Sequence, residues 1–232
     1  MKELNVIILA AGLGKRMNSS LPKVLHSLAG KSLLSHVFDT ANSLLPHRIC
    51  VVYGHGNDAV RDAIGNDELI WVKQEPQLGT GHALLQALPQ LDKKGLTLVL
   101  YGDVPLISFE TLQKLISASL KERLALLTMR LDEPAGYGRI VRDTESNNII
   151  AIVEDKDTNK DQQKIKEINT GIMLIPNANL HEWLPKLQNK NSQKEYYLTD
   201  IVAIAAKARE EIEAAHPSNN WEVLGVNSKV QL

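Results

Sequence analysis

A glycine-rich segment followed by two cations is the first feature of this sequence that suggests chemistry. The segment Leu9–Met17, LAAGLGKRM, directly follows an apolar run. Its glycines let backbone N–H groups approach a phosphate, and nearby cations offset the phosphate charge. Lys23 follows seven residues after Arg16, and Pro22 stiffens the chain in front of it, so the Lys23 ammonium is aimed at one place. The pattern predicts an anion-binding loop in which Arg16 and Lys23 face one phosphate-sized space.

Two common phosphate-binding motifs are only partly matched. The glycine spacing begins like a dinucleotide fingerprint, but Met17 replaces the third glycine, so the motif alone gives a dinucleotide site little support. The tripeptide at 30–32, GKS, ends like a P-loop. However, Leu25 stands where the first glycine is required, and no strand pattern precedes it. A P-loop is therefore excluded.

Polar residues follow two further apolar runs. Gln77–His82, QLGTGH, opens a helical pattern, and its backbone amides suit an anion or a base edge. A plain turn with Thr80 as helix cap is the alternative. Tyr101–Pro105, YGDVP, ends another run. One carboxylate plus phosphates is how Mg²⁺ is usually held, so Asp103 is a candidate metal ligand, with a turn-forming aspartate as the alternative.

Other reactive residues favour plainer interpretations. Asp155-Lys156-Asp157 has the D-x-D spacing of metal-dependent glycosyltransferases, but it lies among many Lys and Asp residues, and a solvated charge run is the better interpretation. The seven histidines show no H-x-x-x-H or H-x-H metal spacing, and His82 is interpreted as structural. Cys50 is the only cysteine, which excludes a disulfide framework and a Cys-based metal cluster, and its apolar run predicts an inert core thiol.

Alternating short apolar runs and helical patterns must position these residues. The runs suit strands buried on both faces, at Val6–Leu9, Ile49–Tyr53, Leu69–Val72 and Leu96–Tyr101. Helices are predicted between and after them, at Leu33–Leu45, Asp58–Ile64, Ala83–Leu88 and Ser108–Leu120. This alternation predicts an α/β fold with a mixed, mainly parallel sheet flanked by helices, with ligands beyond the carboxyl ends of its strands.

The pattern changes after residue 124. Strands at Leu124–Leu131 and Ile149–Val153, on either side of the turn-rich Asp132–Arg139, predict a hairpin or small β-rich lobe. Asp155–Ile168 is strongly polar and predicts an exposed excursion. A strand and an amphipathic helix follow, at Ile172–Ile175 and Thr199–Glu211. We expect one domain with two lobes.

Composition limits the classes of function. The chain has 232 residues, 44% hydrophobic and 23% charged, as in ordinary globular proteins. Its 26 cations and 27 anions give a net charge of −1, so no global field attracts nucleic acid or an anionic membrane. No apolar stretch approaches the ~20 residues that span a bilayer, and Val6–Ala11 is too short for a signal peptide. We expect a cytoplasmic protein that holds small anions with a few local cations.

Together these segments resemble the signature of the sugar-nucleotide pyrophosphorylases. More specifically, they resemble the N-terminal domain of bacterial bifunctional enzymes that join an N-acetylglucosamine-1-phosphate uridyltransferase to a glucosamine-1-phosphate acetyltransferase. The resemblance runs from residue 4 to the end. After the N-terminal LAAGLGKRM and LPK, it is carried by Gln74, Gln77–His82, Tyr101–Leu106, Gly136–Ile140, Glu167–Gly171, Glu195–Asp200 and Gly225–Asn227.

The resemblance implies a Rossmann-like nucleotidyltransferase. It would make UDP-N-acetylglucosamine and pyrophosphate from UTP and N-acetylglucosamine 1-phosphate, for peptidoglycan and lipopolysaccharide precursors. The residues implied on the nucleotide side are Leu9, Ala10, Ala11 and Gly12 along the nucleotide, Gln74, Gly79 and Thr80 at the uridine, and Tyr101 and Gly102 near the ribose and metal. Those implied for the rest of the reaction are Gly138, Glu154, Asn169 and Thr170 at the sugar, Asp103 and Asn227 on Mg²⁺, and Arg16 and Lys23 on phosphates. Glu154 ends one predicted strand and Asn169 opens another, so the two are expected to face one pocket from neighbouring strands.

The resemblance also implies a domain boundary. Residues 1–227 would be the uridyltransferase domain, and 228–232 would begin the linker to an acetyltransferase β-helix that these residues do not contain. The complete parent would be a homotrimer, and a monomer is one state open to this fragment. Acetyltransferase activity is not expected here.

Three other functions remain as alternatives. One is a pyrophosphorylase for another sugar phosphate or nucleotide, and another is a glycosyltransferase that uses Asp155-Lys156-Asp157. A non-catalytic nucleotide-sugar sensor is the third. It is disfavoured because a pure binder could lose Arg16, Lys23, Asp103 and Asn227, and all four are present.

Overall fold

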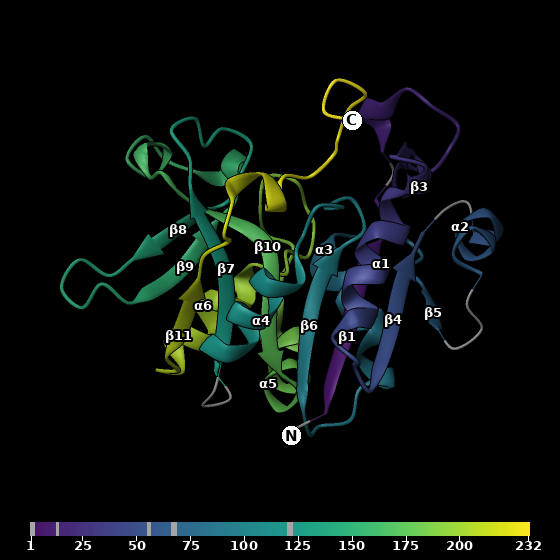
Figure 1. Ribbon diagram of the computed structural model, residues 1–232. Coiled ribbons are helices and arrows are strands. Elements are labelled where there is room, and N and C mark those ends of the chain that lie inside the picture. Colours follow the sequence, from purple (N-terminus) through teal and green to yellow (C-terminus); the bar gives the residue numbers. More distant parts are fainter. Residues whose placement is uncertain (1–2, 13, 55–56, 66–68, 120–122) are drawn as a thin grey trace.

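The computed structural model describes residues 3–12, 14–54, 57–65, 69–119 and 123–232. In this part of the chain a nine-stranded sheet runs through the molecule, with helices on both faces (Figure 1). β1 (Leu4–Ala10) lies between β4 (Arg48–Tyr53) and β6 (Leu96–Tyr101), and β5 (Ile70–Lys73) lies beyond β4. All four strands are parallel, as their continuous apolar runs predict.

The other half of the sheet contains one reversed strand. β10 (Glu167–Pro176) runs antiparallel to both β6 and β7 (Leu124–Arg130), and β11 (Ile212–Ala215) runs parallel to β7. Along the order β11-β7-β10-β6-β1-β4-β5, β10 therefore opposes all the others. The predicted fold class, a mixed and mainly parallel sheet, is confirmed.

Two hydrophobic cores lie on opposite faces of this sheet. One is covered by α1 (Leu33–Ser43), α2 (Asn57–Ile64) and α4 (Phe109–Ala118), and the other by α3 (Thr80–Ala87), α5 (Asn177–Trp183) and α6 (Asp200–Lys207). β1 serves both cores, because successive side chains point to opposite faces. Val6 and Ile8 enter the first core, and Ile7 and Leu9 enter the second.

Local chemistry sets where two of these helices begin. The side chains of Ser32 and Ser108 accept hydrogen bonds from the backbone N–H groups of Ser35 and Thr111, which caps α1 and α4. A two-stranded hairpin, β2 (Ser27–Leu28) with β3 (Lys31–Ser32), precedes α1. Among the described residues, no helix is long and apolar enough to cross a membrane.

The structure corrects the predicted lobe. Its hairpin consists of β8 (Arg139–Arg142) and β9 (Ile149–Val153), whereas the strand expected as its first arm is β7 in the main sheet. β8 was not predicted, because it is short and follows directly on a turn. β8 also pairs with β10 through a single residue pair, which attaches the hairpin to the main sheet. We use the term lobe for this hairpin, the segment 154–166 after it and the start of β10 beside it, residues 167–169. In Figure 1 the lobe extends to the left of the sheet.

Two other boundaries differ from the expectation. The helix predicted to reach Glu211 ends at Lys207, because Arg209 adopts a φ of 61°, and the chain then enters β11. The segment expected to be an exposed excursion ends in buried residues, since Glu167 and Ile168 already belong to β10. Leu120, predicted at the end of a helix, lies outside the described residues.

Candidate functional site

A cavity of about 450 Å³ lies at the carboxyl ends of β1 and β6, where the parallel strands place it. Its volume falls within the range of small-molecule pockets. The lining residues come from four parts of the chain: Leu9 to Gly12, Gly14, Lys23 and Val24 near the N-terminus; Gln74, Gln77, Gly79, Thr80 and Ala83 after β5; Tyr101 and Asp103 at the end of β6; and Glu195. In Figure 1 this edge is at the top, where the yellow C-terminal segment lies beside the purple N-terminal loop.

Three residues far apart in sequence meet at this cavity. The Lys23 ammonium forms an ion pair with the Asp103 carboxylate and donates a hydrogen bond of 3.0 Å to Asn227 Oδ1. The Lys23 and Asp103 side chains are only 12% and 15% exposed. The N–H of Val226 donates to the carbonyl of Asp103 at 2.8 Å, which brings Asn227 to this place. Because water is largely excluded, charge here acts more strongly than it would at the surface.

The oxygens in this cluster suit a divalent cation. Asp103 Oδ2 and Asn227 Oδ1 both accept hydrogen bonds from the Lys23 ammonium and so lie close together, and hard cations such as Mg²⁺ bind carboxylate and amide oxygens. In the described residues no group of three or more His, Cys, Asp or Glu side chains could hold a metal ion. The donor set therefore fits Mg²⁺ held jointly with phosphate oxygens, and it does not form a complete protein cage.

Arg16 is separated from this cluster. It lies in a short 3-10 turn, Lys15–Met17, and is exposed, and it does not line the cavity. Met17, which replaces the third glycine of the dinucleotide pattern, is only 1% exposed, and its N–H donates to the carbonyl of Gly14 at 2.8 Å. Met17 thus anchors the turn in the core. The structure brings Lys23 to Asp103 and Asn227, but it does not bring Arg16 there.

The loop between β5 and α3 forms another wall of the cavity. Gln74 is 4% exposed, and its Nε2 donates to the carbonyl of Gly79 at 2.9 Å. Gly79 has a φ of 109°, and a Cβ there would lie 2.6 Å from the carbonyl oxygen of Tyr196. Glycine is therefore required where these two segments touch. Thr80 does not cap α3; its hydroxyl accepts from the N–H of Leu198 at 3.1 Å.

The residues proposed for the sugar lie around Gly138. The N–H of Asn169 donates to the Gly138 carbonyl at 2.8 Å, and a Cβ on Gly138 would lie 3.5 Å from Glu154 Oε2. Glu154 and Asn169 thus adjoin the same glycine, although their strands are not neighbours as expected, because β8 lies between β9 and β10. The hydroxyl of Thr170 donates to the carbonyl of Leu127 at 2.7 Å, so it is engaged with β7.

A partly buried tyrosine, Tyr101, joins the two groups of residues. Burial raises the pKa of Tyr101 above its usual range, and the charges of Glu154 and Asp103 raise it further. The ring packs closely on Gly171, where a Cβ would lie 2.6 Å from it. Burial also raises the pKa of Glu154, against the effect of a 2.8 Å hydrogen bond from the Thr199 hydroxyl. Tyr101 therefore lies within the field of both carboxylates.

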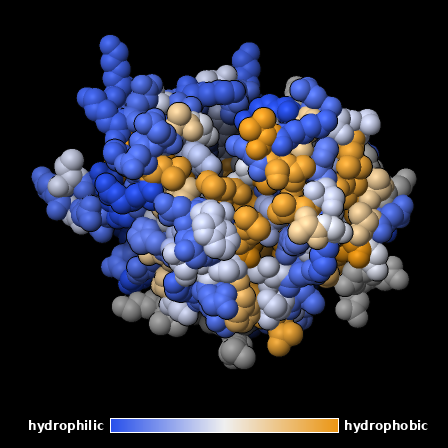
Figure 2. All heavy atoms as spheres, turned by 45° about the horizontal axis from the view of Figure 1, so that its top comes forward, coloured by the Kyte–Doolittle hydropathy of each residue, from blue (hydrophilic) through white to orange (hydrophobic). Residues whose placement is uncertain are grey.

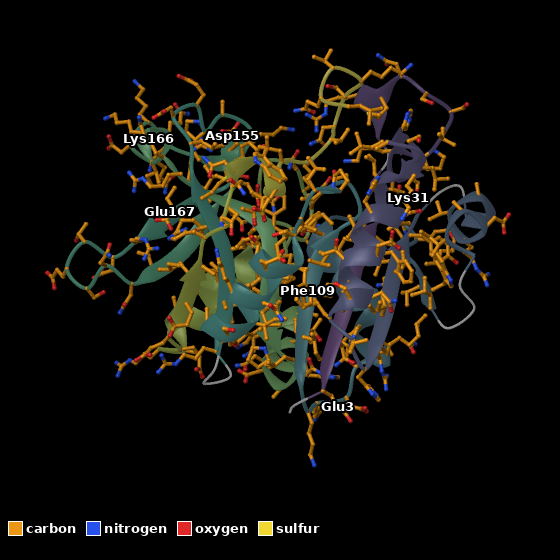
Figure 3. All side chains as sticks on the ribbon, in the orientation of Figure 1. Glu3, Lys31, Phe109, Asp155, Lys166 and Glu167 are labelled. Atoms are coloured by element: carbon orange, nitrogen blue, oxygen red, sulfur yellow. The ribbon has the colours of Figure 1, made fainter. Side chains whose placement is uncertain are left out.

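The D-x-D segment serves the framework. Asp155 pairs with Arg139 Nη2 at 3.0 Å, and Asp157 accepts from the Ser192 N–H at 2.9 Å and from the Tyr197 hydroxyl at 3.2 Å. Figure 3 shows Asp155 in the upper left part of the molecule, with Glu167 below it. Figure 2 shows hydrophilic residues gathered on the side of the lobe. The segment is thus only partly the solvated charge run that was predicted: Lys156 and Asp157 are exposed, but both aspartates also make contacts within the protein.

Three residues at the site carry no role predicted from the sequence. Gln77 and Glu195 line the cavity, and Arg139 is 2% exposed beside Gly138. All three belong to segments that carry the family resemblance, but a single-sequence pattern does not distinguish them from their neighbours. Their positions depend on contacts between distant segments.

The fold and the site define a nucleotide-binding α/β domain of the nucleotidyltransferase class. Its marks are parallel strands, a glycine loop at their carboxyl edge and a lysine–carboxylate pair beside the cavity. The model of the MobA-like NTP transferase domain family matches residues 6–219. The chain belongs to this family.

Individual proteins match the chain at high sequence identity. The chain is 61% identical to "Bifunctional protein GlmU" of Nitrosospira multiformis, over 100% of this chain and 50% of that protein. It is 59% identical to the protein of the same name from Nitrosomonas europaea (100% and 51%) and 56% identical to that from Cupriavidus metallidurans (99% and 50%). The chain thus spans about half the length of these relatives.

Solved structures confirm the fold. A UDP-glucose pyrophosphorylase complexed with UDP-glucose matches with a TM-score of 0.77 at 16% identity, covering 93% of this chain and 92% of that one. A putative glucose-1-phosphate thymidylyltransferase from Bacillus anthracis matches with a TM-score of 0.78 at 19% identity, covering 98% and 92%. At these identities the likeness concerns the fold alone.

Proposed function

We propose that this chain makes UDP-N-acetylglucosamine and pyrophosphate from UTP and N-acetylglucosamine 1-phosphate. The observation that carries the proposal is the cluster of Lys23, Asp103 and Asn227 at the cavity, with Glu154 and Asn169 beyond Tyr101. The first group suits a triphosphate, and the second suits a sugar that bears hydroxyls and an amide. We also propose that residues 1–227 form the domain responsible.

The reaction needs no protein nucleophile. A phosphate oxygen of the sugar phosphate attacks the α-phosphorus of UTP, the bond from this phosphorus to the bridging oxygen breaks, and pyrophosphate leaves. The attacking oxygen is already ionised at neutral pH, so a general base is not required. The surroundings of His82 fit a reaction without a general base, because burial lowers the pKa of His82 and its ring nitrogens contact Gln74 and Gln86. We assign His82 a structural role.

The main barrier is charge repulsion between the two substrates. Each pair of like charges at 4 Å costs about 1 kcal/mol in water and about 4 kcal/mol at an effective dielectric constant of 20. Lys23 supplies positive charge beside the cavity, and Asp103 and Asn227 would hold Mg²⁺, which neutralises phosphate charge. Arg16 lies outside the cavity, so its proposed phosphate contact requires its exposed side chain to turn toward bound nucleotide. Catalysis would then rest on positioning and electrostatics.

Sugar selection is assigned to the lobe. Glu154 can accept hydrogen bonds from sugar hydroxyls, and the Asn169 side chain can both donate and accept. A buried group left without its partner costs about 1–3 kcal/mol. We therefore expect N-acetylglucosamine 1-phosphate to be preferred over glucose 1-phosphate and glucosamine 1-phosphate.

A pyrophosphate-release assay tests the proposal. It should compare several nucleoside triphosphates and several sugar phosphates, with and without Mg²⁺. The expected result is Mg²⁺-dependent release that is fastest with UTP and N-acetylglucosamine 1-phosphate. Release that is fastest with another pair would favour a sibling pyrophosphorylase. No release with any pair would overturn the proposal.

A further inference from the structure

We propose that Gln77 and Arg139 are positioning residues, each of which orients the backbone N–H of one substrate-site glycine. Gln77 would act on Gly12 in the nucleotide half of the site, and Arg139 on Gly138 in the sugar half. This inference rests on the proposed function, because only that function assigns the two glycines to different substrates.

The first contact joins three segments. The Nε2 group of Gln77, after β5, donates to the carbonyl of Ala11, after β1. Gly54, which follows β4 and is buried, lies against this contact. A Cβ there would lie 1.9 Å from Gln77 Nε2 and 2.9 Å from the Ala11 oxygen. The contact therefore requires glycine at 54.

The second contact lies in the lobe. A guanidinium nitrogen of Arg139 donates to the carbonyl of Tyr137, and the other terminal nitrogen pairs with Asp155 at 3.0 Å. The Arg139 side chain is only 3% exposed. The next carbonyl, that of Gly138, is held by the N–H of Asn169. The backbone on both sides of Gly138 is therefore fixed.

The geometry of the peptide bond connects each contact to a glycine. A trans peptide is planar, and its C=O and N–H point in opposite directions. The peptide that carries the Ala11 carbonyl also carries the Gly12 N–H, and the peptide that carries the Tyr137 carbonyl also carries the Gly138 N–H. Both peptides are trans. Fixing each carbonyl therefore fixes the direction of the glycine N–H before any substrate binds, which lowers the ordering cost of binding.

The proposal makes the two contacts selective. Loss of the Gln77 contact frees the Gly12 N–H and weakens UTP binding. Loss of the Arg139 contact frees the Gly138 N–H and weakens binding of the sugar phosphate. A purely structural role would damage both substrates alike or lower stability alone.

The test is a set of saturation curves for both substrates. Gln77→Met removes the donor without adding charge, and Gly54→Ala displaces Gln77 while leaving its side chain intact. Arg139→Lys keeps the charge but cannot serve Tyr137 and Asp155 with a planar fork. Gln113→Met on the exposed face of α4 and Arg142→Lys on β8 are the matched controls. Melting curves show whether each variant is folded.

We expect Gln77→Met and Gly54→Ala to raise the KM for UTP by about three- to tenfold, the range that one hydrogen bond of ordinary net strength gives. The KM for the sugar phosphate should stay within about twofold. Arg139→Lys should show the reverse pattern, and the controls should change neither value. If Arg139→Lys does not fold, the two variants at Gln77 and Gly54 decide.

Equal changes for both substrates, or no change in folded variants, would overturn this inference. Inactivity of the parent with every substrate pair would instead overturn the proposed function. In that case calorimetric binding of UTP to the parent and to Gly54→Ala tests the Gln77 contact alone, and equal affinities would contradict it. If the parent prefers another pair, the same curves are measured with that pair.

Discussion

The nucleotide half of the site and the lobe are built differently. Around the cavity, the polar groups come mostly from loops after β1, β5 and β6, and the charged side chains are the part-buried pair Lys23–Asp103 and Glu195. In the lobe, Arg139 and Glu167 are buried charged side chains, and Glu154 is partly buried. We propose that the first half binds its ligand at a preformed sheet edge, whereas binding in the second depends on how each covered charge is compensated.

Two glutamates in the lobe show this dependence. Burial works to raise the pKa of Glu167, but hydrogen bonds from Arg142 at 2.8 Å and Thr128 at 3.0 Å outweigh it and hold the pKa below its usual range. Burial raises the pKa of Glu154, which accepts a hydrogen bond from a neutral hydroxyl, that of Thr199. Among the described residues no cation forms an ion pair with this carboxylate, which lies at the position proposed to bind sugar. Such uncompensated groups are typical of functional sites.

The largest effect is expected in the nucleotide half. Asp103→Ala should abolish turnover at ordinary Mg²⁺, because it removes the carboxylate of the proposed metal site. Asp103→Asn, which keeps an oxygen near Lys23, should be folded and equally inactive, and circular dichroism checks the fold. Asn227→Ala should weaken metal binding less, since a neutral oxygen contributes less than a carboxylate. Near-normal activity of Asp103→Asn with an unchanged Mg²⁺ requirement would contradict the metal assignment.

Lys23 should give the next largest loss. Lys23→Ala and Arg16→Ala should each lower the rate, because each removes a charge-assisted contact worth roughly 1–3 kcal/mol. The buried position of Lys23 makes its loss the greater of the two. Lys23→Arg should not restore full activity, because a planar fork does not replace a compact ammonium. Initial-rate measurements check both, and full activity of Lys23→Ala would show that this lysine does not touch the reacting phosphates.

How far the sequence predicts this molecule differs between the same two regions. Continuous apolar runs indicated the parallel strands well, and β6 has the predicted bounds, Leu96–Tyr101. Such strands are buried on both faces, so their composition alone identifies them. The Pro22-Lys23 and Asp103 patterns also pointed to the edge where the cavity lies. Only the fold, however, shows that Lys23 contacts Asp103 and that Arg16 does not line the cavity.

The lobe and β11 were less predictable for a physical reason. β8 contains a buried arginine, and β11 is a short strand next to a helix, so neither has a distinctive local pattern. Their pairing depends on β9, β10 and β7, which lie elsewhere in the sequence. For the same reason, Gly138, Glu154 and Asn169 were assigned by resemblance and not by spacing.

The lobe should control the choice of sugar. Glu154→Ala and Asn169→Ala should raise the KM for the sugar phosphate far more than the KM for UTP, because each removes a hydrogen-bonding partner at a cost of about 1–3 kcal/mol. The measurement is a pair of saturation curves per variant. Equal damage to both substrates would show that these two residues do not form the sugar pocket, and the division between the two halves of the site would fail.

The smallest effect concerns stability and pH. Because the folded-state pKa of Glu154 is raised, the native state binds more protons than the unfolded state between the two pKa values. Stability is therefore lost as pH rises through this window. Glu154→Gln removes that loss and keeps an acceptor for Thr199, so it should melt at a higher temperature than the parent near neutral pH. The advantage should shrink as pH falls below the unfolded value of about 4.3.

Glu167→Gln is the matched opposite. The folded-state pKa of Glu167 is lowered, so its stabilising contribution is present above the unfolded pKa and is lost as pH falls through the folded pKa. This variant should melt below the parent at neutral pH and approach it in acid. The measurement is the melting temperature of the parent and of the two Gln variants across pH. Changes of the same sign in both variants would mean that the two carboxylates are compensated alike and would contradict the prediction. Glu154→Gln should at the same time raise the KM for the sugar phosphate. The carboxylate charge is not needed for stability, but it strengthens the hydrogen bonds that the sugar hydroxyls would donate.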